Sequence, residues 1–206
     1  HEEIVAEPDL ILAPDLAQRF WSFVERRCAS EPVSRIVGSR EFYGREFQVT
    51  PAVLYPRADT ETLIAAALPL ARGKCRILDL GTGSGALLLA ALSLFPGAEG
   101  IGIDASAAAL AVAKENAFTC GFGNRSAFMH ASWREPGWEN TLGPFDLILC
   151  NPPYVEDDAK LDRSVRAFEP ASALFSGSQG LDDYRFLIPQ IPALLGPQGT
   201  AIFEIG

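Results

Sequence analysis

A glycine-rich segment separates a short apolar run from a longer one in the first half of the chain. It reads Asp79-Leu80-Gly81-Thr82-Gly83-Ser84-Gly85, after a run of strand length at 76–80 and before a run of helix length at 86–95. Glycines at this spacing permit a tight turn and let a bound molecule approach the backbone. The segment therefore predicts a strand, loop and helix of an α/β fold, with a ligand at the end of the strand.

An alternation of strands and helices continues after this loop. The further expected elements are strands at 100–103, 145–150 and 200–205, another strand just before Trp133, and helices at 107–120 and 181–195, the last interrupted by Pro189 and Pro192. This pattern predicts an α/β fold with a doubly wound, mostly parallel sheet of about five strands. A chain of 206 residues is long enough to bury one such core beside a small appendage.

The residues before the α/β region follow another pattern. Apolar residues recur at helical spacing from Pro14 to Cys28, which predicts an amphipathic helix. Two strand-like runs around Gly44, within 41–49, predict a hairpin, and a helix is expected to start near Asp59.

These patterns divide the chain into three predicted parts. Residues 1–38 are expected to belong to an N-terminal helical domain, and 39–55 to form a β-hairpin linker. Residues 56–206 are expected to form the α/β domain. We expect that domain to continue beyond Gly206, because a sheet strand seldom ends a domain so abruptly.

Charge and composition argue against several classes of protein. The net charge is −9 and the pI is near 4.7, so we expect no broad basic surface and no nucleic-acid partner. No apolar run reaches the roughly 18 residues that cross a membrane. Cys28, Cys75, Cys120 and Cys150 are spaced for neither a metal site nor a disulfide framework. We expect a soluble, cytoplasmic monomer with reduced thiols and no metal.

Two carboxylates narrow the choice of ligand. Asp104 ends a predicted strand about 20 residues after the glycines, where a carboxylate can bind both hydroxyls of a ribose. The pattern Gly81-x-Gly83-x-x-Ala86 suits both NAD and S-adenosylmethionine. Asp79 favours S-adenosylmethionine, because a carboxylate would repel a pyrophosphate and attract the ammonium group of a methionine moiety. In the alternative interpretation the glycines serve only packing, and Asp104 caps the following helix.

Asn151-Pro152-Pro153-Tyr154 directly follows a predicted buried strand, at the end where α/β sheets place their ligands. A delocalised lone pair makes an amide nitrogen a poor nucleophile, so an enzyme that methylates it must orient the NH₂ group. The Asn151 side-chain oxygen and the Pro152 carbonyl can each accept one N–H, and Tyr154 can stack on the planar group. The alternative is a proline-rich turn in which Asn151 bonds its own backbone.

These motifs resemble a known family, the HemK-type protein N5-glutamine methyltransferases, which modify peptide chain release factors. The resemblance extends from about Ser34 to the C-terminus. It also rests on the segments Arg35-Ile36-Val37-Gly38, Glu41-Phe42, Pro56-Arg57, Thr60-Glu61, Phe168-Glu169-Pro170 and Ala173-Leu174.

The resemblance implies a Rossmann-like class I methyltransferase domain of seven strands, with the last pair beyond Gly206. It also implies a preceding helical domain for substrate recognition. The implied cofactor is S-adenosyl-L-methionine, the implied product is S-adenosyl-L-homocysteine, and the implied substrate is the Gly-Gly-Gln loop of a release factor.

The resemblance also assigns site residues. The cofactor would be lined by Asp79, Gly81, Thr82, Gly83, Ser84, Gly85, Asp104, Trp133 and Asn151. The catalytic group would be Asn151, Pro152 and Tyr154, and the substrate would contact these residues, Pro153, Arg57 and Glu61. Arg57, Thr60, Glu61 and Glu169 suit a salt-bridged lid and a helix start as well as they suit substrate contact. The chain departs from the family pattern at two positions, with Ala58 in place of proline and Ser132 in place of aspartate.

Four other functions remain open. A ribosomal-protein glutamine methyltransferase would need the same catalytic residues, and an adenine-N6 methyltransferase would use the same tetrapeptide on a flipped base. An NAD-dependent oxidoreductase would need a proton donor that the sequence does not show. A non-catalytic S-adenosylmethionine-binding module would bind the cofactor without turnover.

Overall fold

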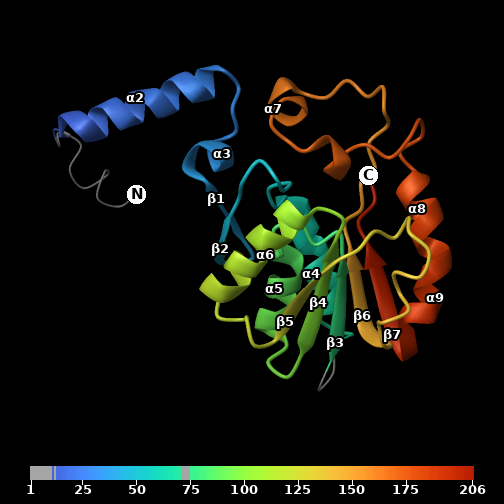
Figure 1. Cartoon of the computed structure of the whole chain (residues 1–206). Helices are drawn as coiled ribbons and strands as arrows, with labels where there is room; N and C mark the ends of the chain where they lie inside the picture. Colours follow the sequence, from blue (N-terminus) through green and yellow to red (C-terminus); the bar gives the residue numbers. More distant parts are fainter. Residues whose placement is uncertain (1–10, 12, 71–74) are drawn as a thin grey trace.

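A computed structural model describes residues 11, 13–70 and 75–206 of the chain. At its centre lies a sheet of five parallel strands in the order β5-β4-β3-β6-β7 (Figure 1). The strands are β3 (Arg76–Leu80), β4 (Glu99–Asp104), β5 (Ser126–His130), β6 (Phe145–Cys150) and β7 (Leu195–Phe203).

The strand order leaves a crevice at the centre of the sheet. The chain runs outward from β3 through β4 to β5, then returns to the other side of β3 to form β6 and β7. Connections therefore leave β3 and β6 in opposite directions, and such a switch point is where open α/β sheets bind ligands. In the register of this pair Leu80 faces Cys150, so the residues that follow both strands emerge side by side.

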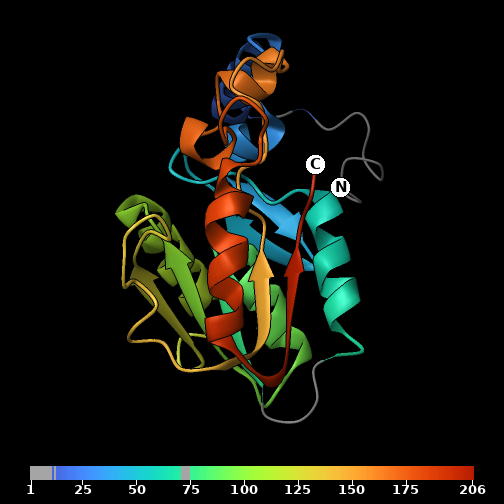
Figure 2. The same cartoon turned by 90° about the vertical axis from the view of Figure 1, so that its right-hand side faces the viewer.

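Helices cover both faces of the sheet (Figures 1 and 2). One face carries α4 (Glu61–Ala67), α5 (Ala86–Leu94) and α6 (Ala107–Thr119), and the other carries α8 (Asp182–Leu187), η3 (Ile188–Gln190) and α9 (Ile191–Leu194). Successive side chains of a strand point to opposite faces, and both faces of β6 are apolar. Leu147 and Leu149 pack in the layer of α4 and α5, whereas Ile148 packs with α8 and α9.

A hairpin joins the N-terminal region to the sheet domain. Its strands β1 (Ser39–Phe42) and β2 (Arg45–Gln48) are antiparallel, and Tyr43 and Gly44 form the turn with positive φ angles. The buried Asn116 of α6 accepts a hydrogen bond from the Gln48 N–H at 2.8 Å and donates to the Gln48 carbonyl at 3.1 Å. A third bond, from the same amide to the Ser84 carbonyl at 2.8 Å, ties the hairpin to the glycine-rich loop.

Ahead of the hairpin lie α2 (Pro14–Cys28) and α3 (Val33–Val37). The longer helix buries none of its residues and extends away from the sheet (Figure 1). The shorter elements between the hairpin and α8 are η1 (Ala58–Thr60), α7 (Arg163–Arg166) and η2 (Ala171–Ala173). The division at 38 and 55 stays a prediction, and residues 1–10 and 12 of the first part lie outside the described residues.

Most of the predicted helices and strands agree with the observed ones. The helix at 14–28, the strands at 76–80 and 145–150 and the interruption of the last helix are confirmed. The expected strand at 200–205 is wrong in its bounds, because β7 starts at Leu195 and ends at Phe203. Its pairing with β6 shifts register between Phe145 and Leu147, which face Leu195 and Thr200, so the glycine-containing segment 196–199 interrupts the ladder.

Within the described residues, no helix is long and apolar enough to cross a membrane. The same residues contain no cluster of three or more His, Cys, Asp or Glu side chains that could hold a metal ion.

Candidate active site

A cavity of about 460 Å³ opens at the carboxyl ends of β3, β4 and β6. Of the residues predicted from the sequence, its wall contains Asp79, Gly81, Thr82, Gly83, Ser84, Asp104, Trp133, Asn151, Pro153 and Arg57. Such a volume is within the range of small-molecule sites. The switch point of the sheet is therefore a pocket in which residues far apart in the sequence meet.

The glycine-rich loop forms the floor of this cavity. Gly81, Gly83 and Gly85 all have positive φ angles, a conformation that side chains with a Cβ rarely adopt. A Cβ at Gly81 would lie 3.3 Å from Cη2 of Trp133, so the indole packs directly on this glycine. Gly85 instead faces Ala113 of α6, where a Cβ would come within 3.2 Å, and it is absent from the cavity wall. The first two glycines thus shape the cavity, whereas Gly85 allows close helix packing.

Asp79 lies at the end of β3 and is almost fully buried. Its Oδ2 accepts a hydrogen bond from the Thr82 hydroxyl at 2.6 Å. Burial raises the pKa of this carboxyl to about 7, opposed by the Thr82 hydrogen bond and increased further by the charge of Asp104. Asp79 therefore gains and loses its proton near neutral pH, and a cation in the cavity would favour its charged form.

Asp104 ends β4 and is held by two backbone groups. Its Oδ2 accepts the Gly83 N–H at 2.9 Å and its Oδ1 accepts the Ser106 N–H at 2.8 Å. Burial raises its pKa, and these backbone hydrogen bonds oppose the shift. The side-chain cap of α6 is Ser106, whose hydroxyl accepts from the Ala109 N–H at 3.2 Å, so Asp104 is not that cap. Each carboxylate oxygen keeps a lone pair for a further donor.

Asn151 stands where this cavity meets a second one of about 750 Å³. Asn151 and Arg57 contribute to both walls. The Asn151 amide donates from Nδ2 to the Thr60 hydroxyl at 3.1 Å, and no described residue donates to its Oδ1. A Cβ at Gly81 would lie 3.9 Å from the Asn151 carbonyl oxygen, so the start of the tetrapeptide adjoins the glycine-rich loop.

The rest of the tetrapeptide divides between the two cavities. Pro152 is buried and borders neither cavity, whereas Pro153 borders the first. Tyr154 borders the second, and its hydroxyl donates to Glu204 Oε1 at 3.1 Å. Burial, together with the charge of Glu204, raises the pKa of Tyr154, so its hydroxyl stays protonated at neutral pH.

The resemblance segments form a buried ionic cluster beside the cavities. Arg35 donates to Glu169 Oε2 at 2.6 Å, and its guanidinium also bonds the carbonyls of Thr50 and Val53. Arg57 lies 3.7 Å from Glu169 Oε1 and packs over the ring of Tyr55 at 3.9 Å. Burial raises the pKa of Glu169, although Arg35 opposes the shift.

Glu61 lies apart from this cluster and borders neither cavity. Its Oε1 accepts the Tyr43 N–H of the hairpin turn at 2.9 Å. The cluster around Glu169 thus joins α3, the 50–57 segment and the 152–180 segment, while Glu61 holds the hairpin.

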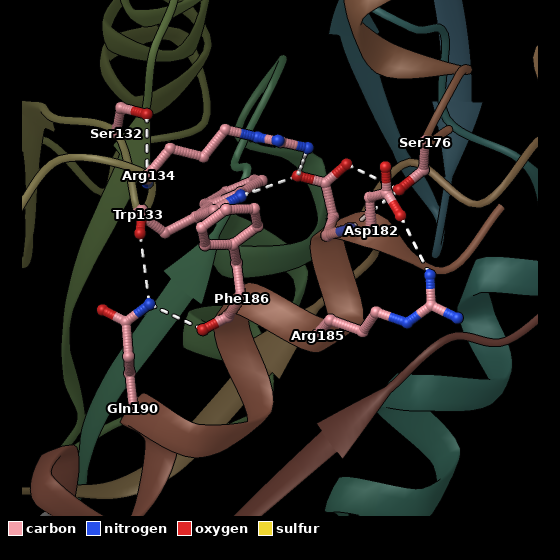
Figure 3. A network of polar contacts seen from close by, with 9 residues as sticks. Ser132, Trp133, Arg134, Ser176, Asp182, Arg185, Phe186 and Gln190 are labelled. Carbon is pink, nitrogen blue, oxygen red and sulfur yellow. Dashed lines mark hydrogen bonds and ion pairs between the residues drawn. The ribbon is translucent and has the colours of Figure 1, made fainter. Parts of the chain in front are cut away.

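Sequence reasoning missed Asp183, a buried carboxylate of α8 in the wall of the first cavity. It accepts hydrogen bonds from Trp133 Nε1 at 2.8 Å and Arg134 Nη2 at 2.9 Å. Figure 3 labels these two donors. Ser132, where the resemblance expects aspartate, accepts the Arg134 N–H at 3.3 Å. The carboxylate beside Trp133 therefore comes from a distant helix, and no local motif could have revealed it.

Known proteins match almost the whole chain. Residues 71–202 match a model of a methyltransferase domain, and residues 1–38 match the PrmC N-terminal domain. The release factor glutamine methyltransferase of Bradyrhizobium diazoefficiens is 45% identical over 98% of this chain and 69% of its own length. That of Rhodospirillum rubrum is 44% identical over 98% of this chain and 62% of its own length. The chain belongs to the release factor glutamine methyltransferase family.

The release factor glutamine methyltransferase of Agrobacterium fabrum is 40% identical over 99% of this chain. The chain spans 62% to 72% of the length of these three relatives. A solved structure of ribosomal protein L11 methylase from Lactobacillus delbrueckii subsp. bulgaricus superposes with a TM-score of 0.50 at 25% identity. The match covers 71% of this chain and 60% of that one. The predicted family, fold class and methyltransferase class are thereby confirmed.

Proposed function

We propose that the chain transfers a methyl group from S-adenosylmethionine to the side-chain amide nitrogen of a protein glutamine. The proposed substrate is the Gly-Gly-Gln motif of a peptide chain release factor. The observation that carries the proposal is the position of Asn151, which borders both cavities and adjoins the glycine-rich loop. A donor in the first cavity and an amide entering through the second would meet at this residue.

The residues of the first cavity suit S-adenosylmethionine. Asp104 is held rigidly and has free lone pairs for two ribose hydroxyls, and Asp79 offers a negative charge to the ammonium group. The Trp133 indole forms an apolar wall on which adenine can stack. When bound, the cofactor supplies a methyl group on a positively charged sulfur.

Asn151 is the residue best placed to orient the glutamine. The bond from Nδ2 to Thr60 fixes the side-chain amide and leaves Oδ1 able to accept one N–H of the substrate. Pro152 borders neither cavity, but its carbonyl receives no hydrogen bond from a described residue and is proposed to accept the other N–H when the substrate amide lies beside Asn151. Two such acceptors would turn the nitrogen lone pair out of conjugation and toward the first cavity. Orientation of this kind can supply several kcal/mol, and the methylated nitrogen, which is then strongly acidic, releases its proton to water without a general base.

Tyr154, Pro153 and Arg57 are proposed as the walls that hold the glutamine side chain. Tyr154 is fixed by its bond to Glu204, and Arg57 by its contacts with Tyr55 and Glu169. Glu61 is proposed to act on the substrate site indirectly, because its carboxylate accepts a hydrogen bond from the hairpin turn.

The test is transfer of tritium from labelled S-adenosylmethionine to a purified release factor. The matched control is the same factor with alanine in place of the glutamine of its Gly-Gly-Gln motif, and DNA is a third acceptor. We expect label on the unaltered factor alone. Label on the alanine variant or on DNA would contradict the proposal.

A further inference from the structure

Asp183 connects two parts of the site that are far apart in the sequence. Its side chain is 5% exposed, and both of its oxygens are hydrogen-bonded. Oδ1 accepts from Trp133 Nε1 and Arg134 Nη2, and Oδ2 accepts from the Ser176 hydroxyl at 2.7 Å. Burial of a carboxylate is unfavourable unless such donors surround it, so the three donors and the carboxylate hold one another in a defined arrangement.

The first partner, Trp133, is a wall of the cofactor cavity. The benzene edge of its indole packs on Gly81, and the opposite edge carries the Nε1–H that bonds Asp183. The Trp133 carbonyl accepts from Gln190 Nε2 at 3.1 Å (Figure 3). Gln190 Oε1 in turn accepts from Trp138 Nε1 at 2.6 Å. The backbone of Trp133 is thus fixed by Gln190, but the orientation of its ring depends on Asp183.

The other partner, Ser176, belongs to the segment that follows the Asn-Pro-Pro-Tyr motif. Its N–H donates to the Val155 carbonyl at 2.9 Å, next to the bridge between Val155 and Phe175. Its hydroxyl also accepts the Asp183 N–H at 2.8 Å. The carboxylate therefore joins the indole wall to the chain that leaves Tyr154.

The neighbouring Asp182 shows what a surface carboxylate of the same helix does. It pairs with Arg185 at 3.0 Å, with both side chains about half exposed, and it borders neither cavity. An exposed pair of this kind contributes little to stability. The two adjacent aspartates therefore carry the same charge on the same turn, but only Asp183 contacts a wall of the cavity.

We propose that Asp183 is a positioning residue for the adenosine part of the cofactor, acting by holding the Trp133 indole against the glycine-rich loop. The proposal rests on the proposed function, since it assumes S-adenosylmethionine in the first cavity. In the absence of the carboxylate, the partly buried indole N–H has no acceptor among the described residues, and the ring is free to turn.

Calorimetric binding of two ligands to the folded protein tests this inference. S-adenosylhomocysteine contains adenosine and the amino acid, whereas 5′-methylthioadenosine lacks the amino acid. We expect Asp183→Ala to lower the affinity for both ligands by the same factor, about 10-fold. Asp182→Ala should change either affinity by less than about 2-fold. In a Trp133→Phe background, which lacks the indole N–H, Asp183→Ala should have no further effect.

Three results would overturn the inference. The first is an Asp183→Ala protein that melts at a lower temperature but binds both ligands as the unaltered protein does. Asp183 would then stabilise the fold without positioning the indole for the cofactor. The second is an Asp183→Ala protein that binds S-adenosylhomocysteine more weakly but 5′-methylthioadenosine as before. The third is an equal loss of affinity on Asp183→Ala in the Trp133→Phe background. Failure of the unaltered protein to bind S-adenosylhomocysteine would instead contradict the proposed function, and the inference with it.

Asp183→Asn decides the question if the alanine variant does not fold. An asparagine oxygen can accept from Trp133 and Arg134 while its NH₂ donates to Ser176, so both affinities should stay within about 3-fold of the unaltered protein. Hydrogen exchange of the Trp133 indole N–H should remain slow in this variant. A 10-fold or greater loss of affinity with slow exchange would show that the charge, and not the position of the indole, matters.

Discussion

Replacing Asp79 by asparagine should stabilise the folded chain above neutral pH and weaken cofactor binding. Burial raises the pKa of this carboxyl from 3.8 to about 7. Between these pH values the folded chain keeps a proton that the unfolded chain has released. The free energy of unfolding contributed by Asp79 therefore falls as the pH rises from about 4 to about 7, and it stays at its lowest value above that.

The size of the effect follows from the same pKa shift. Each unit of difference between folded and unfolded pKa corresponds to about 1.4 kcal/mol, so the shift corresponds to about 4 kcal/mol at most. An asparagine carries no charge at any pH and does not lose this stability. The difference between Asp79→Asn and the unaltered protein should rise from near zero at pH 4 to its full value at pH 8. Other titrating groups are common to both proteins and cancel.

Denaturant unfolding followed by circular dichroism, without ligand, measures this difference at each pH. Glu99→Gln is the control, because it removes one negative charge from an exposed residue at the opposite end of β4. A stability difference that does not change with pH, or a less stable Asp79→Asn protein at pH 8, would refute the reasoning. The same variant should bind S-adenosylhomocysteine more weakly at pH 8, because it lacks the charge that pairs with the ammonium group.

Three further substitutions, one of them with a matched control, probe the glycine-rich loop and the residues that hold it. Asp104→Ala should lower the affinity for S-adenosylhomocysteine, measured by calorimetry, by about 10- to 100-fold, because hydrogen bonds to a charged acceptor are lost. Unchanged affinity would show that Asp104 does not bind the cofactor. Gly81→Ala and Gly121→Ala introduce the same backbone strain, but only the first creates a contact with Trp133, so only it should reduce cofactor affinity. Asn116→Ala should lower the free energy of unfolding by about 2 kcal/mol, because the buried Ser84 carbonyl and the partly buried backbone groups of Gln48 lose their partner; equal denaturation midpoints would contradict that role.

The sheet was predictable where its strands are buried on both faces. The run at 145–150 is apolar except for Asp146, and the run at 76–80 contains three large aliphatic residues; β3 and β6 have these same bounds. The edge strand β5 was expected only from its place before Trp133, because none of its residues is buried and its sequence contains Ser126 and His130. Edge strands have one unpaired side and fewer buried positions, so their sequences are less distinctive.

The candidate site was predictable where its residues belong to local motifs. Asp79 and Asp104 lie in the last two residues of their strands and Asn151 directly follows β6, and the topology of the sheet brings them to one cavity. The bonds from Asn151 to Thr60 and from Trp133 to Asp183 join residues 91 and 50 positions apart. Pairings of that kind depend on how helices pack on the sheet, and a single sequence contains no local pattern that predicts them.

The position of Asn151 between the two cavities is tested most directly by measuring transfer and binding on the same Asn151→Ala protein. We predict that single-turnover methyl transfer to a release factor falls by more than about 100-fold, because the substrate amide is no longer oriented. The dissociation constant for S-adenosylhomocysteine should stay within about 5-fold of the unaltered protein, because Asp79, Asp104 and Trp133 are intact. Transfer at the unaltered rate would contradict the account.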